Sequence, residues 1–142
     1  MFLYEAARAQ HVRAVILPAL ASGKAVLCDR FCDATSAYQG FSRGLDTAWV
    51  DELNAFASAG LVPTLTFLLD VGPEDGFHRL HGRGTQPDRM ESETIEFHRR
   101  VREGYLRLHA THPGRIVRID GTPSPDEVFR HVRSVVAEQL GW

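Results

Sequence analysis

Apolar residues follow two alternating patterns along the chain. Short apolar runs that end at an acid predict buried strands at Ala25–Asp29, Leu65–Asp70 and Ile116–Asp120. Apolar residues spaced three and four positions apart predict helices that begin near residues 2, 49, 73, 97 and 125. Strands alternating with helices favour a parallel sheet with helices on both faces, so the expected fold class is α/β.

Local signals add detail to two of the helices. Pro18 lies inside the first one, at about residues 2–22, and is expected to kink it. Ser124 and Glu127 form a capping box around Pro125 at the first helical position, which predicts the start of the last helix.

Each predicted strand ends at an aspartate: Asp29, Asp70 or Asp120. The carboxyl ends of parallel strands meet at one edge of a sheet, where ligands gather. We therefore expect these acids along one rim, although Asp70 and Asp120 could equally cap the turns that follow them. Asp29 stands out because Arg30 follows it, which puts an anion and a cation together at a strand end.

The bulk properties are those of one ordinary globular domain. The 142 residues carry a formal net charge of −2, which gives no sign of a general nucleic-acid binder. No apolar run approaches the ~20 residues of a membrane span, and the start of the chain lacks signal-peptide features. Cys28 and Cys32 make a poor zinc or disulfide pattern, so a reducing cytoplasm is the default location.

Arginines near loops and helix edges suggest contacts with phosphate. They are Arg8, Arg30, Arg43, Arg79, Arg83 and Arg89. The arginine side chain binds phosphate through a planar fork, and phosphoryl transfer depends on positive charge placed where negative charge develops. The polar loop that carries Arg83 and Arg89 would suit a lid over phosphates; otherwise it is a solvated loop whose arginines pair with Asp88 and Glu91.

Several motifs occur together in the order found in one enzyme family. The most specific is Asp29-Arg30 followed by Ala37-Tyr38-Gln39-Gly40, and Tyr4-x-x-x-Arg8-x-Gln10-His11 precedes it. Further matches lie at residues 43–45, 68–74, 79–91, 101–106 and 119–121. Together they resemble bacterial thymidylate kinases over the whole length of the chain.

The resemblance implies a three-layer, P-loop nucleoside monophosphate kinase-like α/β fold and the reaction of dTMP with ATP and Mg²⁺ to give dTDP. The residues it implies for dTMP are Tyr4, Arg8, Arg30, Thr35, Tyr38, Gln39 and Tyr105. Those for ATP are Arg79, Arg83, Arg89, Gly121 and Thr122. The implied catalytic groups are Asp29, Arg30, Arg83 and Arg89, with Asp29 near Mg²⁺ through water. Related kinases are commonly homodimers, which leaves a homodimer open here, and no nucleic-acid or membrane partner is implied.

The phosphate-binding loop of that family, Gly-x-x-x-x-Gly-Lys-Ser/Thr, is not found in these 142 residues, and Lys24 is the only lysine. By resemblance, the first (central) and second strands are also missing, so residues 1–142 are expected to form a single partial domain with a lid at about 82–91. We expect the central position between Ala25–Asp29 and Leu65–Asp70 to be vacant, or the two strands to pair directly.

Three functions remain open: a thymidylate kinase represented by an incomplete chain, a non-catalytic remnant that binds a nucleotide or a partner protein, and a related nucleotide kinase with another acceptor.

Overall fold

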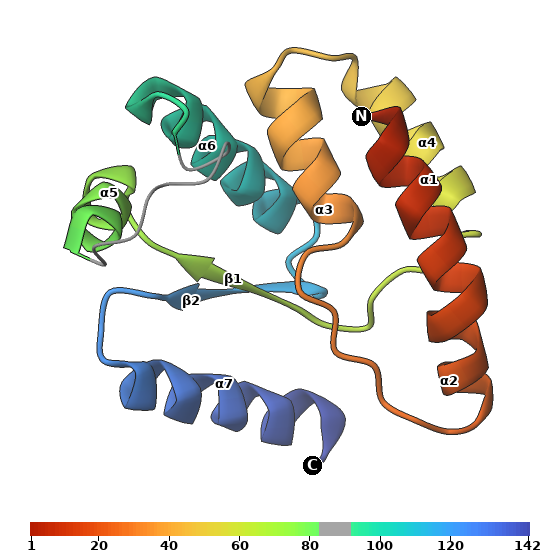
Figure 1. Cartoon of the computed structure of the whole chain (residues 1–142). Coiled ribbons are helices and arrows are strands. Elements are labelled where there is room, and N and C mark those ends of the chain that lie inside the picture. The colour runs from red at the N-terminus through yellow and green to blue at the C-terminus, as the bar shows by residue number, and fades with distance from the viewer. Residues whose placement is uncertain (83–91) are drawn as a thin grey trace.

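The computed structural model describes residues 1–82 and 92–142, so nearly all of the predicted lid lies outside the described residues. Helices cover both faces of a small sheet, with α7 (Pro125–Leu140) on one face and α6 (Ile95–Thr111) on the other (Figure 1). The α5 helix (Pro73–Gly82) lies at the carboxyl end of the sheet. This arrangement agrees with the α/β class and with helices on both faces.

The sheet confirms two of the predicted strands. Among the described residues it consists of β1 (Thr66–Asp70) and β2 (Ile116–Asp120), which run parallel. Their register sets Asp70 opposite Asp120. Two of the strand-end acids therefore do share one rim.

The third predicted strand, Ala25–Asp29, is wrong: this segment carries no strand. A strand exists only where a neighbour supplies hydrogen bonds, and within the described ranges β1 pairs with β2 alone. Leu27 is 100% exposed as a result. Neither direct pairing with β1 nor an intervening strand occurs in the described part of the chain, which agrees with the expected vacancy.

The first helical segment runs from α1 (Phe2–His11) through the π-helical η1 (Val12–Ile16) into α2 (Leu17–Ala21). Proline has no N–H to donate and its ring crowds the preceding turn, so the backbone ahead of it must adjust. The π-helical stretch ends at Ile16, two residues before Pro18. The disturbance expected at Pro18 thus takes the form of a wider helical turn within a segment that continues to Ala21.

A second helical segment was not predicted. It joins α3 (Cys32–Thr35) to the π-helical η2 (Ser36–Ser42) and packs on α6. A Cβ at Gly104 would lie 2.9 Å from the Cβ of Phe41, so the close approach of η2 and α6 requires glycine there. Ala37 and Phe97 are buried at this junction.

Two remaining helices begin where side chains cap them. Asp46 accepts hydrogen bonds from the backbone at the start of α4 (Thr47–Ala57), and the predicted capping box of Ser124 and Glu127 is present at α7. Within the described residues, no helix is long and apolar enough to cross a membrane.

Candidate functional site

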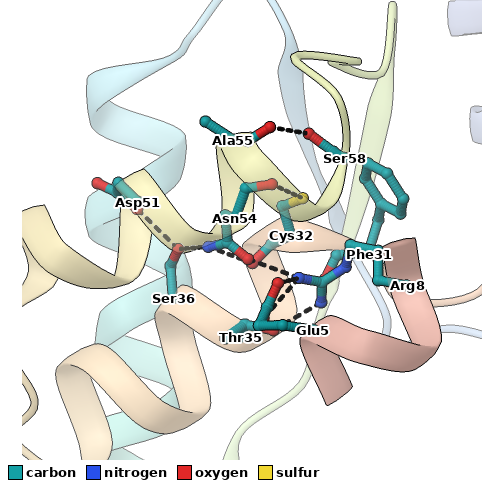
Figure 2. Close-up of polar contacts among 10 residues, drawn as sticks. All are labelled: Glu5, Arg8, Phe31, Cys32, Thr35, Ser36, Asp51, Asn54, Ala55 and Ser58. Carbon is teal, nitrogen blue, oxygen red and sulfur yellow. Dashed lines mark hydrogen bonds and ion pairs between the residues drawn. The ribbon is translucent and has the colours of Figure 1, made fainter. Parts of the chain in front are cut away.

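Arg8 lies at the centre of a buried polar cluster where α1, α3 and α4 meet (Figure 2). Its Nη1 donates to both carboxylate oxygens of Glu5, at 2.7 and 2.6 Å, and to Oδ1 of Asn54 at 2.6 Å. Its Nη2 donates to Oγ1 of Thr35 at 2.6 Å and to the carbonyl of Phe31 at 3.3 Å. Two predicted dTMP residues, Arg8 and Thr35, are therefore in direct contact.

Arg30 lies just before α3 in a backbone conformation that non-glycine residues seldom adopt, with φ at +62°. Its guanidinium stacks over the ring of Tyr38, 5.2 Å from the ring centroid. Arg30 is exposed, and among the described residues no carboxylate forms an ion pair with it. Its hydrogen-bond donors are thus available to an anion.

Arg30 and Tyr38 form a second group of predicted dTMP residues, apart from Arg8 and Thr35. Tyr105 extends this second group, since its ring meets that of Tyr38 edge-on at 6.3 Å. It also packs against the buried cluster of Ala37, Phe97 and Val101, and burial raises its pKa. The position of Tyr105 is therefore compatible both with packing in the core and with lining a nucleotide pocket.

The predicted ATP residues that the structure describes also come together. Arg79 of α5 donates to the carbonyl of Gly121 at 3.0 Å and to that of Thr122 at 2.9 Å. Arg79 lines two adjacent pockets: one of about 370 Å³ beside Tyr105, and one of about 710 Å³ between the sheet and α7. It is therefore placed on the wall between these two spaces.

The strand-end acids differ in what they do. Asp120 accepts from the backbone N–H and the hydroxyl of Thr122, at 2.9 and 2.7 Å, and these bonds lower its pKa. It caps the following turn, one of the two roles left open. Asp70 is buried and bonded to Arg102 and Arg118, so it neither caps a turn nor faces a ligand freely.

Asp29 is exposed. No group of three acidic, histidine or cysteine side chains within residues 1–82 and 92–142 is arranged to hold a metal ion. A water-mediated role of Asp29 at Mg²⁺ therefore stays a prediction.

Comparison with known proteins agrees with the motifs. The family model for thymidylate kinase matches residues 1–132. Thymidylate kinase of Solidesulfovibrio magneticus is 51% identical over 99% of this chain and 70% of its own length. That of Nostoc punctiforme is 46% identical over 99% of this chain and 66% of its own length, and that of Geotalea uraniireducens is 48% identical, with 99% and 68% covered.

The chain belongs to the thymidylate kinase family. It spans about two thirds of the length of the relatives it matches. Membership confirms the resemblance, the expected P-loop nucleoside monophosphate kinase fold class and the phosphotransferase class of the family.

Some predicted site residues of this chain stay apart from the rest. Tyr4 is 58% exposed on α1, and neither its side chain nor that of Gln39 makes a hydrogen bond or ring contact with another described residue. Arg83 and Arg89 lie outside the described residues. The roles of these four residues stay predictions.

The motifs also left some residues of the site unnoticed. Glu5 and Asn54 bind Arg8 directly, and neither was assigned a role from the sequence. Glu5 could have been found, because a residue three positions from an arginine on a helix faces it. Asn54 gave no such signal, since it is 46 positions away and only the fold brings it to Arg8.

Proposed function

We propose that this chain carries the dTMP-binding part of a thymidylate kinase, which transfers the γ-phosphoryl group of ATP to dTMP and gives dTDP. The observation that carries the proposal is the pairing of two groups along one helical segment. Arg8 and Thr35 form the first group, and Arg30 and Tyr38 form the second. A nucleotide placed along this segment would meet the first group with its base and the second with its phosphate.

The polar chemistry of each group suits its part of the nucleotide. The hydroxyl proton of Thr35 and the Nε–H of Arg8 remain as donors after the bonds between these side chains and their neighbours among the described residues. They lie in a buried place, where hydrogen bonds to a base face little competition from water. Arg30 offers an unpaired planar fork, which matches a phosphate. Tyr38, which lies under the Arg30 guanidinium, would pack against the deoxyribose, and Tyr4 and Gln39 would complete the base side.

ATP is proposed to bind near Arg79, with the adenine beside Gly121 and Thr122, where the two pockets adjoin. Arg83 and Arg89 would close over its phosphates. Mg²⁺ usually takes one or two carboxylates, with phosphate oxygens and water as its other ligands. Asp29 is an exposed carboxylate beside Arg30 and so fits a contact with Mg²⁺ through water.

The setting of the enzyme is proposed to be a reducing cytoplasm, and its assembly a homodimer. Both cysteines are free thiols, which suits such a compartment. Phe2 and Leu3 leave an apolar surface on α1 that a second copy could cover.

A polypeptide of these 142 residues is expected to show no measurable thymidylate kinase turnover. The lysine, the hydroxyl and the backbone amides of the phosphate-binding loop are not among its residues, and positioning supplies most of the catalysis in phosphoryl transfer. A coupled assay of ADP release at saturating ATP and dTMP tests this. Turnover in the usual kinase range of ~1–100 s⁻¹ would contradict it.

Binding separates the proposed roles of the two groups. Arg30→Ala is expected to weaken dTMP roughly tenfold or more, because a charge-assisted bond to phosphate is lost, and to leave thymidine nearly unchanged. Isothermal titration calorimetry with both ligands measures this difference. Arg13→Ala removes an exposed arginine that has no assigned role, so it controls for the change in net charge. Equal losses for dTMP and thymidine would show that Arg30 does not hold the phosphate.

A further inference from the structure

Asn54 links Arg8 to a chain of hydrogen bonds that ends at the surface. Its Oδ1 accepts from Nη1 of Arg8 at 2.6 Å, and its Nδ2 donates to Oγ of Ser36 at 3.0 Å. The hydroxyl of Ser36 in turn donates to Oδ1 of Asp51 at 3.0 Å. Figure 2 shows these side chains in sequence, from Arg8 on α1 to Asp51 on α4.

The chain of bonds has one direction only. The Asp51 carboxylate can only accept, so the proton of Ser36 points to it and a Ser36 lone pair faces Asn54. That lone pair can accept only from a donor, so the NH₂ group of Asn54 faces Ser36 and the amide oxygen of Asn54 faces Arg8. A reversed amide would set two donors against each other at Arg8 and two acceptors against each other at Ser36. Nδ2 also donates to the carbonyl of Cys32 at 3.4 Å. Asp51, acting through Ser36, and this carbonyl together fix which end of Asn54 meets the guanidinium.

Burial stabilises this orientation of the hydrogen bonds around Asn54. Asn54 is 5% exposed, and Ser36 and Thr35 are buried with it. Burial also raises the pKa of the neighbouring Cys32 thiol to about 11, so the thiol stays neutral and donates to the backbone carbonyl of Asn54. Water has little access to compete for these groups, and an unsatisfied polar atom here would be costly.

We propose that Asn54 is a positioning residue for recognition of the base, which rests on the proposed function of the site. Together with Glu5 it holds the guanidinium of Arg8 in one orientation, from which Arg8 bonds to Oγ1 of Thr35. Because that oxygen accepts from Arg8, the Thr35 proton is free to point elsewhere, and no acceptor for it is present among the described residues. Nε of Arg8 donates to no described residue in any of these bonds, so it and the Thr35 hydroxyl offer hydrogen-bond donors. Donors match a carbonyl at C4 of a pyrimidine and oppose an amino group there.

The test compares two ligands that share the sugar, the phosphate and the methyl group. In dTMP the C4 substituent is a carbonyl, and in 5-methyl-dCMP it is an amino group. Calorimetry on the whole chain gives the ratio of their dissociation constants. We expect Asn54→Ala to lower this preference for dTMP about tenfold, because Arg8 is no longer held. Asp51→Ala should lower it in the same direction by a smaller factor.

Glu52→Ala is the matched control, since it removes the neighbouring exposed carboxylate of α4, for which no ion pair is recorded. It should leave the preference unchanged. In an Arg8→Ala background, Asn54→Ala should have no further effect on the preference, because the group it positions is gone.

A purely structural role for Asn54 predicts a different result. Loss of folded protein would weaken both ligands by the same factor and leave their ratio intact, and that outcome overturns the proposal. If Asn54→Ala fails to fold by circular dichroism, Asp51→Ala decides, because Asp51 is exposed. If the wild-type chain binds neither ligand, the proposed dTMP site falls, and the role of Asn54 falls with it.

Discussion

Replacing Glu5 with alanine is expected to lower the free energy of unfolding by about 3 kcal/mol. Glu5 and Arg8 form an ion pair in which the side chains are 8% and 10% exposed. Removing the acid leaves the buried guanidinium without its countercharge, although Asn54 and Thr35 still accept from it. Urea unfolding followed by circular dichroism measures the loss.

The control for this prediction is Glu103→Ala on α6. Glu103 pairs with Arg107 four residues later, and both side chains are more than half exposed. Exposed pairs of this kind contribute less than about 1 kcal/mol, because water and salt screen them. If the two variants lose similar amounts of stability, burial does not strengthen the Glu5–Arg8 pair and the prediction is wrong.

Local pattern was sufficient for elements whose signals lie within their own residues. The apolar runs at Thr66–Asp70 and Ile116–Asp120 form strands, and the capping box at Ser124 starts α7. The run at Ala25–Asp29 has the same local pattern and forms no strand. The two strands pair with each other, whereas Ala25–Asp29 has no hydrogen-bonded neighbour among the described residues. Whether such a neighbour exists cannot be read from the apolar run itself.

The helix at residues 32–42 was missed for the opposite reason. Its serine, threonine and glycine residues are weak helix formers, so the sequence gives little signal for it. Its contact with α6, where Gly104 admits Phe41, supplies the packing that the local sequence lacks. A tertiary contact of this kind cannot be read from periodicity.

The site shows the same division between local and distant information. Arg30 and Tyr38 lie eight positions apart in one motif, and the structure brings them into contact. Asp70 and Asp120 hold the same position at the ends of paired strands, yet only Asp120 caps a turn. The Asp70 carboxylate instead binds Arg102, which lies 32 positions further along the chain, on α6.

Asp70 provides the second large effect, since Asp70→Asn is expected to cost about 2 kcal/mol at neutral pH. The Asp70 carboxylate is 4% exposed and receives two bonds from Arg102, from Nε at 2.6 Å and from Nη2 at 2.9 Å. Arg118 adds a third bond through Nε at 2.8 Å. Both arginines are more than a third exposed, so solvent screens their Coulomb attraction and the cost comes mainly from weakened hydrogen bonds to a charged group.

The pH dependence of that cost identifies its origin. The hydrogen bonds from Arg102, followed by those from Arg118, hold the pKa of Asp70 below its ordinary value of 3.8 in the folded chain. A group with a lowered pKa stabilises the fold above its unfolded pKa, and this stabilisation disappears as the pH falls through the folded pKa. Asparagine does not titrate, so the stability gap between the wild type and Asp70→Asn should be constant above about pH 5 and shrink below about pH 4. Urea unfolding at several pH values measures the gap, and Glu52→Gln, which removes one negative charge without breaking a recorded ion pair, reports the effect of net charge alone. A gap that stays constant down to pH 3 would show that the Asp70 carboxylate does not stabilise the fold through its charge.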